Sequence, residues 1–224
     1  MGGKKKINPG SLYLVLSGAC GSGRGPLEIA KWAIAGGIDI LQMREKDMSP
    51  QELSALGTAL SCLCRKSGII FIVNDDPRLA VDLDADGVHM GQEDLTACSV
   101  DTVRRIVGPR RIIGLSTHNP DQFREALARD VDYLAFGPVF QTKTKSYHIG
   151  TADIRQIVAI TSKPVFFIGG IQTANLDILI KKGATNVALI RDIMEAEDVV
   201  ERTGWYKRKL TGASGRMFLN GPEK

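Results

Sequence analysis

The sequence has few of the residues on which disulfide-rich and zinc-binding domains depend. Its four cysteines show neither a CxxC spacing nor the framework of a small secreted fold (Cys20, Cys62, Cys64 and Cys98). Its three histidines lie at no recognised ligand spacing (His89, His118 and His148). We therefore expect buried or partly buried thiols, and the pattern supports neither a disulfide scaffold nor a zinc centre.

Long apolar runs and clustered basic residues are also missing. No stretch approaches the roughly 20 apolar residues needed to cross a bilayer, and residues 1–10 lack the apolar segment of a secretory signal. Aromatic residues make up only 6% of the chain, and much of the net charge of +4 comes from residues near the two ends. The sequence therefore predicts a cytoplasmic protein with no membrane partner and no nucleic-acid partner.

What is present suits one large domain. The chain has 224 residues, of which 43% are hydrophobic and 24% charged, and no linker or repeat divides it. We expect a flexible N-terminus over residues 1–10 and a single catalytic domain over residues 11–210. Residues 211–224 hold three glycines and a proline and are expected to form a disordered tail. The pattern leaves the oligomeric state open and is compatible with a homo-oligomer.

Eight short apolar stretches alternate with eight helical stretches. The strands are expected at residues 12–16, 38–41, 69–73, 87–90, 111–115, 133–136, 165–168 and 186–190, and a helical segment follows each one. Unbroken apolar strands are typical of a parallel sheet that is covered on both faces. This organisation predicts an α/β fold, a single (β/α)8 TIM barrel. A doubly wound open sheet is the alternative, but no dinucleotide fingerprint follows the first strand.

The stretch Gln42-Met43-Arg44-Glu45-Lys46 directly follows the second predicted strand. Alternate residues of an extended chain face the same way, so Gln42, Arg44 and Lys46 are expected to share one face. Arginine and lysine suit phosphate oxygens, although in isolation these charges would simply be solvated. Polar residues recur after other strands, where the active sites of such barrels lie: Asn74, Asp75, Asp94, Ser116, Thr142, Thr144, Lys145 and Arg191.

Two of these residues are carboxylates from adjacent strand ends. Asp75 and Asp94 would repel each other without a cation, and magnesium commonly binds protein carboxylates together with substrate phosphates. Each residue has a simpler interpretation as a helix cap or turn residue. The pair, set among several cations, favours a site for one magnesium ion and a diphosphate.

A second anion site is predicted after the seventh and eighth strands. Gly169-Gly170 would let backbone amides approach a phosphate closely, and the segment after the eighth strand would supply a helix N-terminus. Phosphate sites recur at this position in such barrels. A metal-bound diphosphate beside a simple phosphate indicates a transfer reaction with a diphosphate leaving group.

Several of these stretches together resemble the motifs of the thiamine-phosphate synthase family. They are Gln42-Met43-Arg44-Glu45-Lys46, Val73-Asn74-Asp75, Gly91-Gln92-Glu93-Asp94, Gly114-Leu115-Ser116-Thr117-His118, Thr142-Lys143-Thr144-Lys145 and Ile168-Gly169-Gly170-Ile171. The resemblance runs from about Leu12 to Tyr206. It implies a TIM-barrel transferase of thiamine biosynthesis that joins hydroxymethylpyrimidine diphosphate to hydroxyethylthiazole phosphate. Diphosphate would leave first, and the thiazole nitrogen would capture the pyrimidine carbocation.

The resemblance also implies a role for each matching residue. The pyrimidine diphosphate would be held by Gln42, Met43, Arg44, Glu45, Lys46, Asn74, Ser116 and Lys145. The thiazole phosphate would be held by Thr142, Lys143, Thr144, Gly170, Ile190 and Arg191. Asp75 and Asp94 would bind magnesium, one ion per subunit. The direct catalytic contribution would come from Arg44, Lys46, Ser116 and Lys145, and no residue need act as a nucleophile.

Three positions depart from the family pattern. Gln141 stands where a proline often precedes the Thr-x-Thr-Lys run, Leu16-Ser17-Gly18 replaces a common Thr-Asp, and Arg191 stands where many members have serine. None of these departures removes a diphosphate or metal group. Two other functions compete with a synthase. One is a related thiazole tautomerase that would use His118 as its acid–base group, and the other is a non-catalytic phosphate-binding regulatory barrel.

Overall fold

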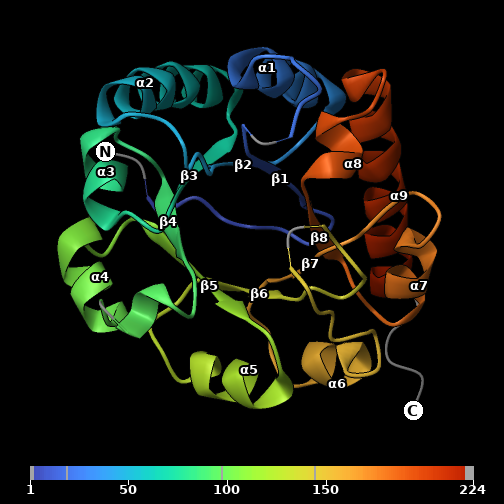
Figure 1. Ribbon diagram of the computed structural model, residues 1–224. Helices are drawn as coiled ribbons and strands as arrows, with labels where there is room; N and C mark the ends of the chain where they lie inside the picture. The colour runs from blue at the N-terminus through green and yellow to red at the C-terminus, as the bar shows by residue number, and fades with distance from the viewer. Residues whose placement is uncertain (1–2, 19, 97, 144, 220–224) are drawn as a thin grey trace.

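Eight parallel strands form one closed barrel in chain order, with helices in a ring around it (Figure 1). The computed structural model describes residues 3–18, 20–96, 98–143 and 145–219. The strands are β1 (Leu12–Leu16), β2 (Ile40–Met43), β3 (Ile70–Asn74), β4 (Gly87–Met90), β5 (Ile112–Thr117), β6 (Tyr133–Phe136), β7 (Val165–Ile168) and β8 (Asn186–Leu189). The predicted TIM barrel is confirmed, and the open-sheet alternative is wrong because β1 pairs with β8.

The outer ring follows the predicted alternation of strands and helices. It consists of α1 (Pro26–Gly36), α2 (Pro50–Ser67), α3 (Pro77–Asp82), the short 3-10 helix η1 (Asp94–Thr96), α4 (Val100–Val107), α5 (Pro120–Leu127), α6 (Ile154–Ala159), α7 (Leu176–Lys181), α8 (Arg191–Met194) and α9 (Val199–Leu219). A capping box precedes α2, since Ser49 and Glu52 bond to each other's backbone amides. No helix in the described part of the chain is long and apolar enough to span a membrane.

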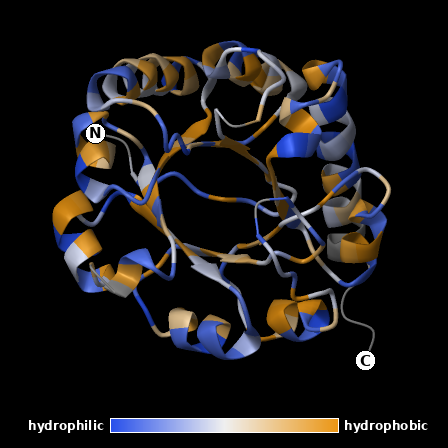
Figure 2. Cartoon of the chain, in the orientation of Figure 1, coloured by the Kyte–Doolittle hydropathy of each residue, from blue (hydrophilic) through white to orange (hydrophobic). Residues whose placement is uncertain are grey.

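Alternate strand residues divide between two apolar clusters. On β1, Leu12, Leu14 and Leu16 belong to the large cluster between the strands and the helices. Tyr13 and Val15 belong to a smaller cluster inside the barrel. In Figure 2 the strands of the barrel wall are largely apolar, whereas the surrounding helices mix apolar and hydrophilic residues. This burial on both faces explains why the strands read as unbroken apolar runs.

The amino end of the barrel carries a repeated backbone clasp. At the start of β2, β4, β6 and β8, one side chain accepts a hydrogen bond from a backbone amide of a neighbouring strand segment. The donating amides are those of Leu12, Phe71, Ile113 and Ser11. The accepting residues, in the same order, are Asp39, Asp86, Asp132 and Asn186. The acids are also paired with cations, as in the 2.7 Å contact between Lys207 and Asp39. These bonds define the strand register at one end of the barrel.

The N-terminal segment lies across this same end. Ile7 packs against the interior cluster, Lys4 pairs with Asp132 at 2.7 Å, and Lys5 pairs with Asp86 at 2.9 Å. Burial opposes ionisation of Asp132, but Lys4 and the neighbouring donors outweigh it and lower the pKa of its carboxyl. The segment predicted to be flexible is thus attached to the barrel by an apolar contact and two ion pairs.

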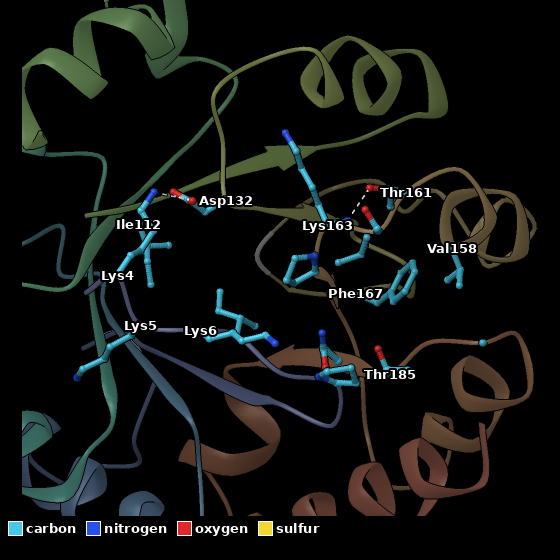
Figure 3. Close-up of a pocket in the computed structure, with 17 residues that line it drawn as sticks. Lys4, Lys5, Lys6, Ile112, Asp132, Val158, Thr161, Lys163, Phe167 and Thr185 are labelled. Atoms are coloured by element: carbon cyan, nitrogen blue, oxygen red, sulfur yellow. Dashed lines mark hydrogen bonds and ion pairs between the residues drawn. The ribbon is translucent and has the colours of Figure 1, made fainter. Parts of the chain in front are cut away.

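A cavity of about 510 Å³ opens beside this segment and is lined by the first residues of β5, β7 and β8 (Figure 3). Two of its basic side chains, Lys4 and Lys163, already bond to protein oxygens. Besides the pair made by Lys4, the Lys163 ammonium donates to the carbonyls of Leu127 and Arg129. The cavity lies at the end of the barrel opposite the predicted site.

The last helix differs from the prediction at its C-terminal end. The sequence predicts a disordered tail from Thr211, but α9 continues to Leu219. Leu210 and Ala213 are buried, and the Ser214 hydroxyl donates to the Leu210 carbonyl. This packing holds two glycines within the helix, which composition alone does not anticipate. Residues 220–224 of the predicted tail lie outside the described residues.

Replacing Gly114 on β5 should destabilise the barrel strongly. A Cβ there would lie 2.0 Å from Cζ of the buried Tyr133, so Gly114→Ala should lower the free energy of unfolding by about 1–3 kcal/mol or more. Gly212→Ala is the matched control on α9, where an added Cβ meets nothing within 4 Å. That variant should be stabilised by up to about 1 kcal/mol. Urea unfolding of both variants measures the difference, and a neutral Gly212→Ala would contradict the extended helix.

Candidate active site

The predicted strand-end residues meet at the C-terminal mouth of the barrel. Gln42, Asn74 and Ser116 have the same parity along their strands as the interior residues Ile40, Ile72 and Ile112. Gln42 is only 3% exposed. Because side chains alternate along a strand, these three polar groups continue the interior surface at its open end. This register is consistent with the prediction that the polar residues at the strand ends lie at one end of the barrel.

Met43 has the opposite parity. Its side chain belongs to the cluster between strands and helices, with Cε 3.2 Å from where a Cβ on Gly57 of α2 would lie. The substrate contact predicted for Met43 therefore does not involve its side chain. β2 ends at Met43, so Arg44 and Lys46 lie in the segment that follows, where Lys46 is exposed. The regular alternation behind the predicted shared face thus stops before Lys46.

Asp75 and Asp94 come together, as predicted. A Cβ on Gly91 would lie 2.6 Å from Oδ2 of Asp94 and 3.8 Å from Oδ1 of Asp75. Burial, and then the neighbouring Asp94 carboxylate, raise the pKa of Asp75 to about 6. The Gly91 amide and the Asn74 side-chain amide donate to Asp75. The neighbouring Asp76, not Asp75, is the helix cap, since it accepts the amides of Arg78 and Leu79.

These two carboxylates fit a hard divalent cation. Neither forms an ion pair with a lysine or arginine within the described ranges, so no cation of this part of the protein offsets their mutual repulsion. No group of three or more candidate ligands among His, Cys, Asp and Glu occurs in the described residues. A magnesium ion here would therefore draw its other ligands from water and substrate oxygens, which is its usual behaviour.

Arg44 follows β2 and Arg191 follows β8, the two strands that pair with β1. Both act electrostatically on the buried Cys20 thiol of the β1–α1 loop. Burial raises the pKa of Cys20, the two arginines oppose that change, and Glu195 and Glu45 add to it. The loop that follows β1 thus lies between the ends of β2 and β8, because both strands pair with β1. Arg24 of the same loop donates to the carbonyls of Met194 and Ala196, so the loop is held against α8.

Three side chains of this region carry buried polar atoms without a hydrogen-bond partner in the described structure. They are Nε2 of Gln42, Oε1 of Glu45 and Nε of Arg191. Such atoms are rare in folded proteins and cost free energy unless a ligand or water satisfies them. Their presence at the predicted mouth indicates a surface shaped for a polar ligand.

Two of the predicted substrate residues also have protein partners. Oε2 of Glu45 accepts the Gly18 amide at 2.6 Å, and burial raises the pKa of the Glu45 carboxyl despite this bond. The Arg191 guanidinium pairs with Glu195 at 2.7 Å, although its side chain is only 34% exposed. The neighbouring Asp192 accepts from Arg202 and Tyr206. α8 is a single turn, so the predicted phosphate site receives little from a helix dipole.

The β6–α6 loop is anchored at its base and exposed at its tip. The amides of Val139 and Phe140 donate to the carbonyls of Ile168 and Gly169 at 2.9 and 3.0 Å. Gly169 and Gly170 have φ values of 99° and 64°, and a Cβ on Gly170 would lie 2.3 Å from the Gln141 carbonyl oxygen. The glycine pair is thus required for this loop contact as well as for any approach of a phosphate.

The loop tip carries the remaining predicted residues. Lys143 and Lys145 are exposed and Thr142 is partly buried, whereas Thr144 lies outside the described residues. His118, the acid–base candidate of the tautomerase hypothesis, donates through Nδ1 to the Gly137 carbonyl at 2.6 Å. Its ring meets the Tyr147 ring edge-on. His118 therefore serves as a contact for this loop.

One residue of the site is not anticipated by the sequence. Nε2 of His89 on β4 lies 2.9 Å from the Ser116 hydroxyl, and Nδ1 lies 2.9 Å from the Tyr133 hydroxyl. Complete burial lowers the pKa of His89 to about 4, so the ring is neutral near pH 7. The signal that places His89 inside the barrel is the alternation along β4, where Val88 and Met90 belong to the outer cluster.

Comparisons with known proteins agree with the motifs. The family model described as thiamine monophosphate synthase matches residues 12–193. The chain is 38% identical to the thiamine-phosphate synthase of Moorella thermoacetica over 92% of this chain and 98% of that protein. It is 37% identical to the thiamine-phosphate synthase of Methanoregula boonei over 90% of this chain and 94% of that protein. The structure of the thiamine phosphate pyrophosphorylase from Pyrococcus furiosus superimposes with a TM-score of 0.82 at 32% identity, covering 91% and 96%.

The contact between Glu45 and Gly18 should hold the β1–α1 loop over the mouth. A Cβ on Gly18 would lie 2.5 Å from Oε2 of Glu45, so Gly18→Ala should break the bond and cost about 1–2 kcal/mol of stability. Amide hydrogen exchange near residues 17–20 should become faster. Gly25→Ala in the same loop is the control, because its Cβ meets nothing within 4 Å. Equal exchange in both variants would show that this contact does not hold the loop.

Proposed function

The chain belongs to the thiamine monophosphate synthase family, and we propose that it joins hydroxymethylpyrimidine diphosphate to hydroxyethylthiazole phosphate. The products are thiamine phosphate and diphosphate. The observation that carries the assignment to this mouth is the close approach of Asp75 and Asp94, two acids that pair with no lysine or arginine among the described residues. Such a site suits a substrate that brings both a diphosphate and the metal bound to it.

The diphosphate end of the first substrate is assigned to the β2, β3 and β4 ends. Asp75 and Asp94 would hold one magnesium ion, which supplies positive charge to the leaving diphosphate. Arg44 and Lys46 add cationic donors, and Lys145 joins them from the exposed loop. These groups stabilise the negative charge that develops on the leaving oxygen. Fixed cations accelerate a reaction most when they act on charge that appears in the transition state.

The pyrimidine is assigned to the neutral polar groups at the mouth. The Gln42 side chain is buried, and its Nε2 has no hydrogen-bond partner among the described residues, so it offers a donor to a ring nitrogen of the pyrimidine. Asn74 and Ser116 continue the same interior surface. Departure of diphosphate leaves a pyrimidine carbocation, which the thiazole nitrogen captures. In this mechanism the protein orients two substrates and excludes water, and needs no nucleophile of its own.

The thiazole phosphate is assigned to the β6, β7 and β8 ends. Arg191 contributes a buried unpaired Nε, and Gly170 brings the backbone close. Ile190 packs against both apolar clusters and offers an apolar surface beside the phosphate. Thr142, Lys143 and Thr144 complete the set from the loop. A tautomerase function is less well supported because proton transfer on the thiazole has no use for the set of cationic and metal-binding groups at the β2, β3 and β4 ends.

The carboxylate pair should be essential for turnover. Asp75→Asn and Asp94→Asn should each reduce diphosphate release at limiting magnesium by about a hundredfold, because each removes a proposed ligand. Magnesium should raise the melting temperature of the wild type but of neither variant. Asp76→Asn is the matched control, since asparagine caps a helix as well as aspartate does and Asp76 caps α3. Normal turnover of both ligand variants would refute the metal assignment.

Arg191 should set the affinity for the thiazole phosphate. A charge-assisted contact in a partly buried site contributes about 1.5–3 kcal/mol, so Arg191→Ser should raise KM for that substrate about ten- to a hundredfold. KM for the pyrimidine diphosphate should not change. Glu195→Gln removes the ion pair but keeps the guanidinium, so it controls for loss of the surface pair. If both constants are unaffected in Arg191→Ser, the phosphate is held by other groups.

A further inference from the structure

A line of four polar groups runs from the mouth into the barrel interior. The Ser116 hydroxyl lies 2.9 Å from Nε2 of His89, and Nδ1 of His89 lies 2.9 Å from the Tyr133 hydroxyl. The Tyr133 hydroxyl lies 2.9 Å from the Tyr13 hydroxyl. Three strands on the same side of the barrel and β1 thus contribute one group each to a continuous hydrogen-bonded chain.

The surroundings of this chain are apolar. Tyr13 and Tyr133 belong to the interior cluster and pack edge-on against Phe166. The His89 ring stacks on the Tyr133 ring, with centroids 5.5 Å apart. Space for the Tyr133 ring depends on Gly114, where any Cβ would overlap it. The geometry of the chain is therefore fixed by packing as well as by its hydrogen bonds.

Counting hydrogens leaves two possible directions for the chain. Each hydroxyl has one hydrogen, and a neutral imidazole has one N–H. In the first direction Tyr13 donates to Tyr133, Tyr133 donates to Nδ1, and Nε2–H donates to Ser116. The Ser116 hydrogen then remains available at the mouth. In the second direction every donor is reversed, and Ser116 donates to His89.

The second direction leaves a buried donor without an acceptor. It requires the Tyr13 hydroxyl to donate elsewhere, yet among the described residues Tyr133 is its hydrogen-bond partner. Tyr13 is only 3% exposed and lies in the apolar interior cluster. An unsatisfied buried donor is strongly disfavoured, whereas the first direction satisfies every hydrogen within the barrel. The apolar surroundings of Tyr13 therefore determine the direction in which the hydrogen bonds run.

We propose that His89 is a positioning residue that donates through Nε2 to Ser116 and so directs the serine hydrogen toward the bound pyrimidine diphosphate. Ser116 is then a donor to an acceptor atom of that substrate, namely a diphosphate oxygen or a ring nitrogen. This inference rests on the proposed function, in which Ser116 contacts the substrate. The Gln92 side chain donates to the Ser116 carbonyl, which fixes the serine backbone from the same side.

The first test reads the tautomer directly and does not depend on activity. Long-range proton–nitrogen correlation spectra of the full-length, ligand-free protein distinguish a protonated Nε2 from a protonated Nδ1. The chain has only three histidines, so His118→Gln and His148→Gln assign the His89 signals. We expect Nε2 to be protonated and Nδ1 bare. A protonated Nδ1 would overturn the proposal.

The second test is a set of steady-state measurements on Ser116 and His89 variants. Ser116→Ala should reduce kcat/KM for the pyrimidine diphosphate, and His89→Phe should reduce it about ten- to a hundredfold through misplacement of the hydroxyl. In the Ser116→Ala background, His89→Phe should cause no further loss, because both changes remove one interaction. His89→Gln keeps an N–H donor and should recover most of the activity. Additive losses, or full activity of His89→Phe, would overturn the inference.

Thr117→Val is the matched structural control. It removes a buried hydrogen bond of the same strand, in which the Thr117 hydroxyl donates to the Ala135 carbonyl at 2.8 Å. It should lower the melting temperature without changing kcat/KM. An equal loss in Thr117→Val and His89→Phe would assign the effect to general destabilisation. A wild type that releases no diphosphate from the two substrates would refute the proposed function, whereas the tautomer measurement would still test His89.

Discussion

The register in which the eight strands pair is the constraint on which the rest of the structure depends. Three aspartates and one asparagine at the amino end accept amide hydrogens from neighbouring segments, and β8 pairs with β1 to close the ring. A slip of one residue would exchange the interior and helix-facing sets of side chains. Gln42, Asn74 and Ser116 would then face the helices, and the mouth would lose its polar surface.

The two ends of the barrel treat charge in opposite ways. At the amino end, the acids are paired with Lys4, Lys5 and Lys207, and their hydrogen bonds hold the register. At the carboxyl end, Asp75 and Asp94 face each other, and Gln42 and Arg191 each have a buried polar atom without a hydrogen-bond partner in the described part of the chain. The first arrangement lowers the free energy of the folded chain, whereas the second raises it until a ligand binds. Local costs of this kind are expected where a protein acts on a substrate.

The site combines residues at the strand ends with residues on loops. Strand-end residues gain their positions from the barrel wall, and His89 extends this support below Ser116. The loop residues depend on specific anchors instead, such as the bond from Gly18 to Glu45 and the contacts of Val139 and Phe140 with the end of β7. The departures from the family pattern at Leu16-Ser17-Gly18 and Gln141 lie at these anchors. Differences between relatives in loop attachment can therefore arise without any change in the groups that face the substrate.

The sequence by itself determined the eight β-α units, the barrel class and the polar residues that end each strand, because burial on both faces and local turn chemistry leave a local pattern. Only the tertiary structure placed Met43 against α2, bound Glu45 to Gly18, extended α9 through two glycines and joined Ser116 to His89. Each of these outcomes depends on contacts between segments that are distant in the chain. Such contacts follow from the closure and register of the barrel, and the spacing of neighbouring residues carries no record of them.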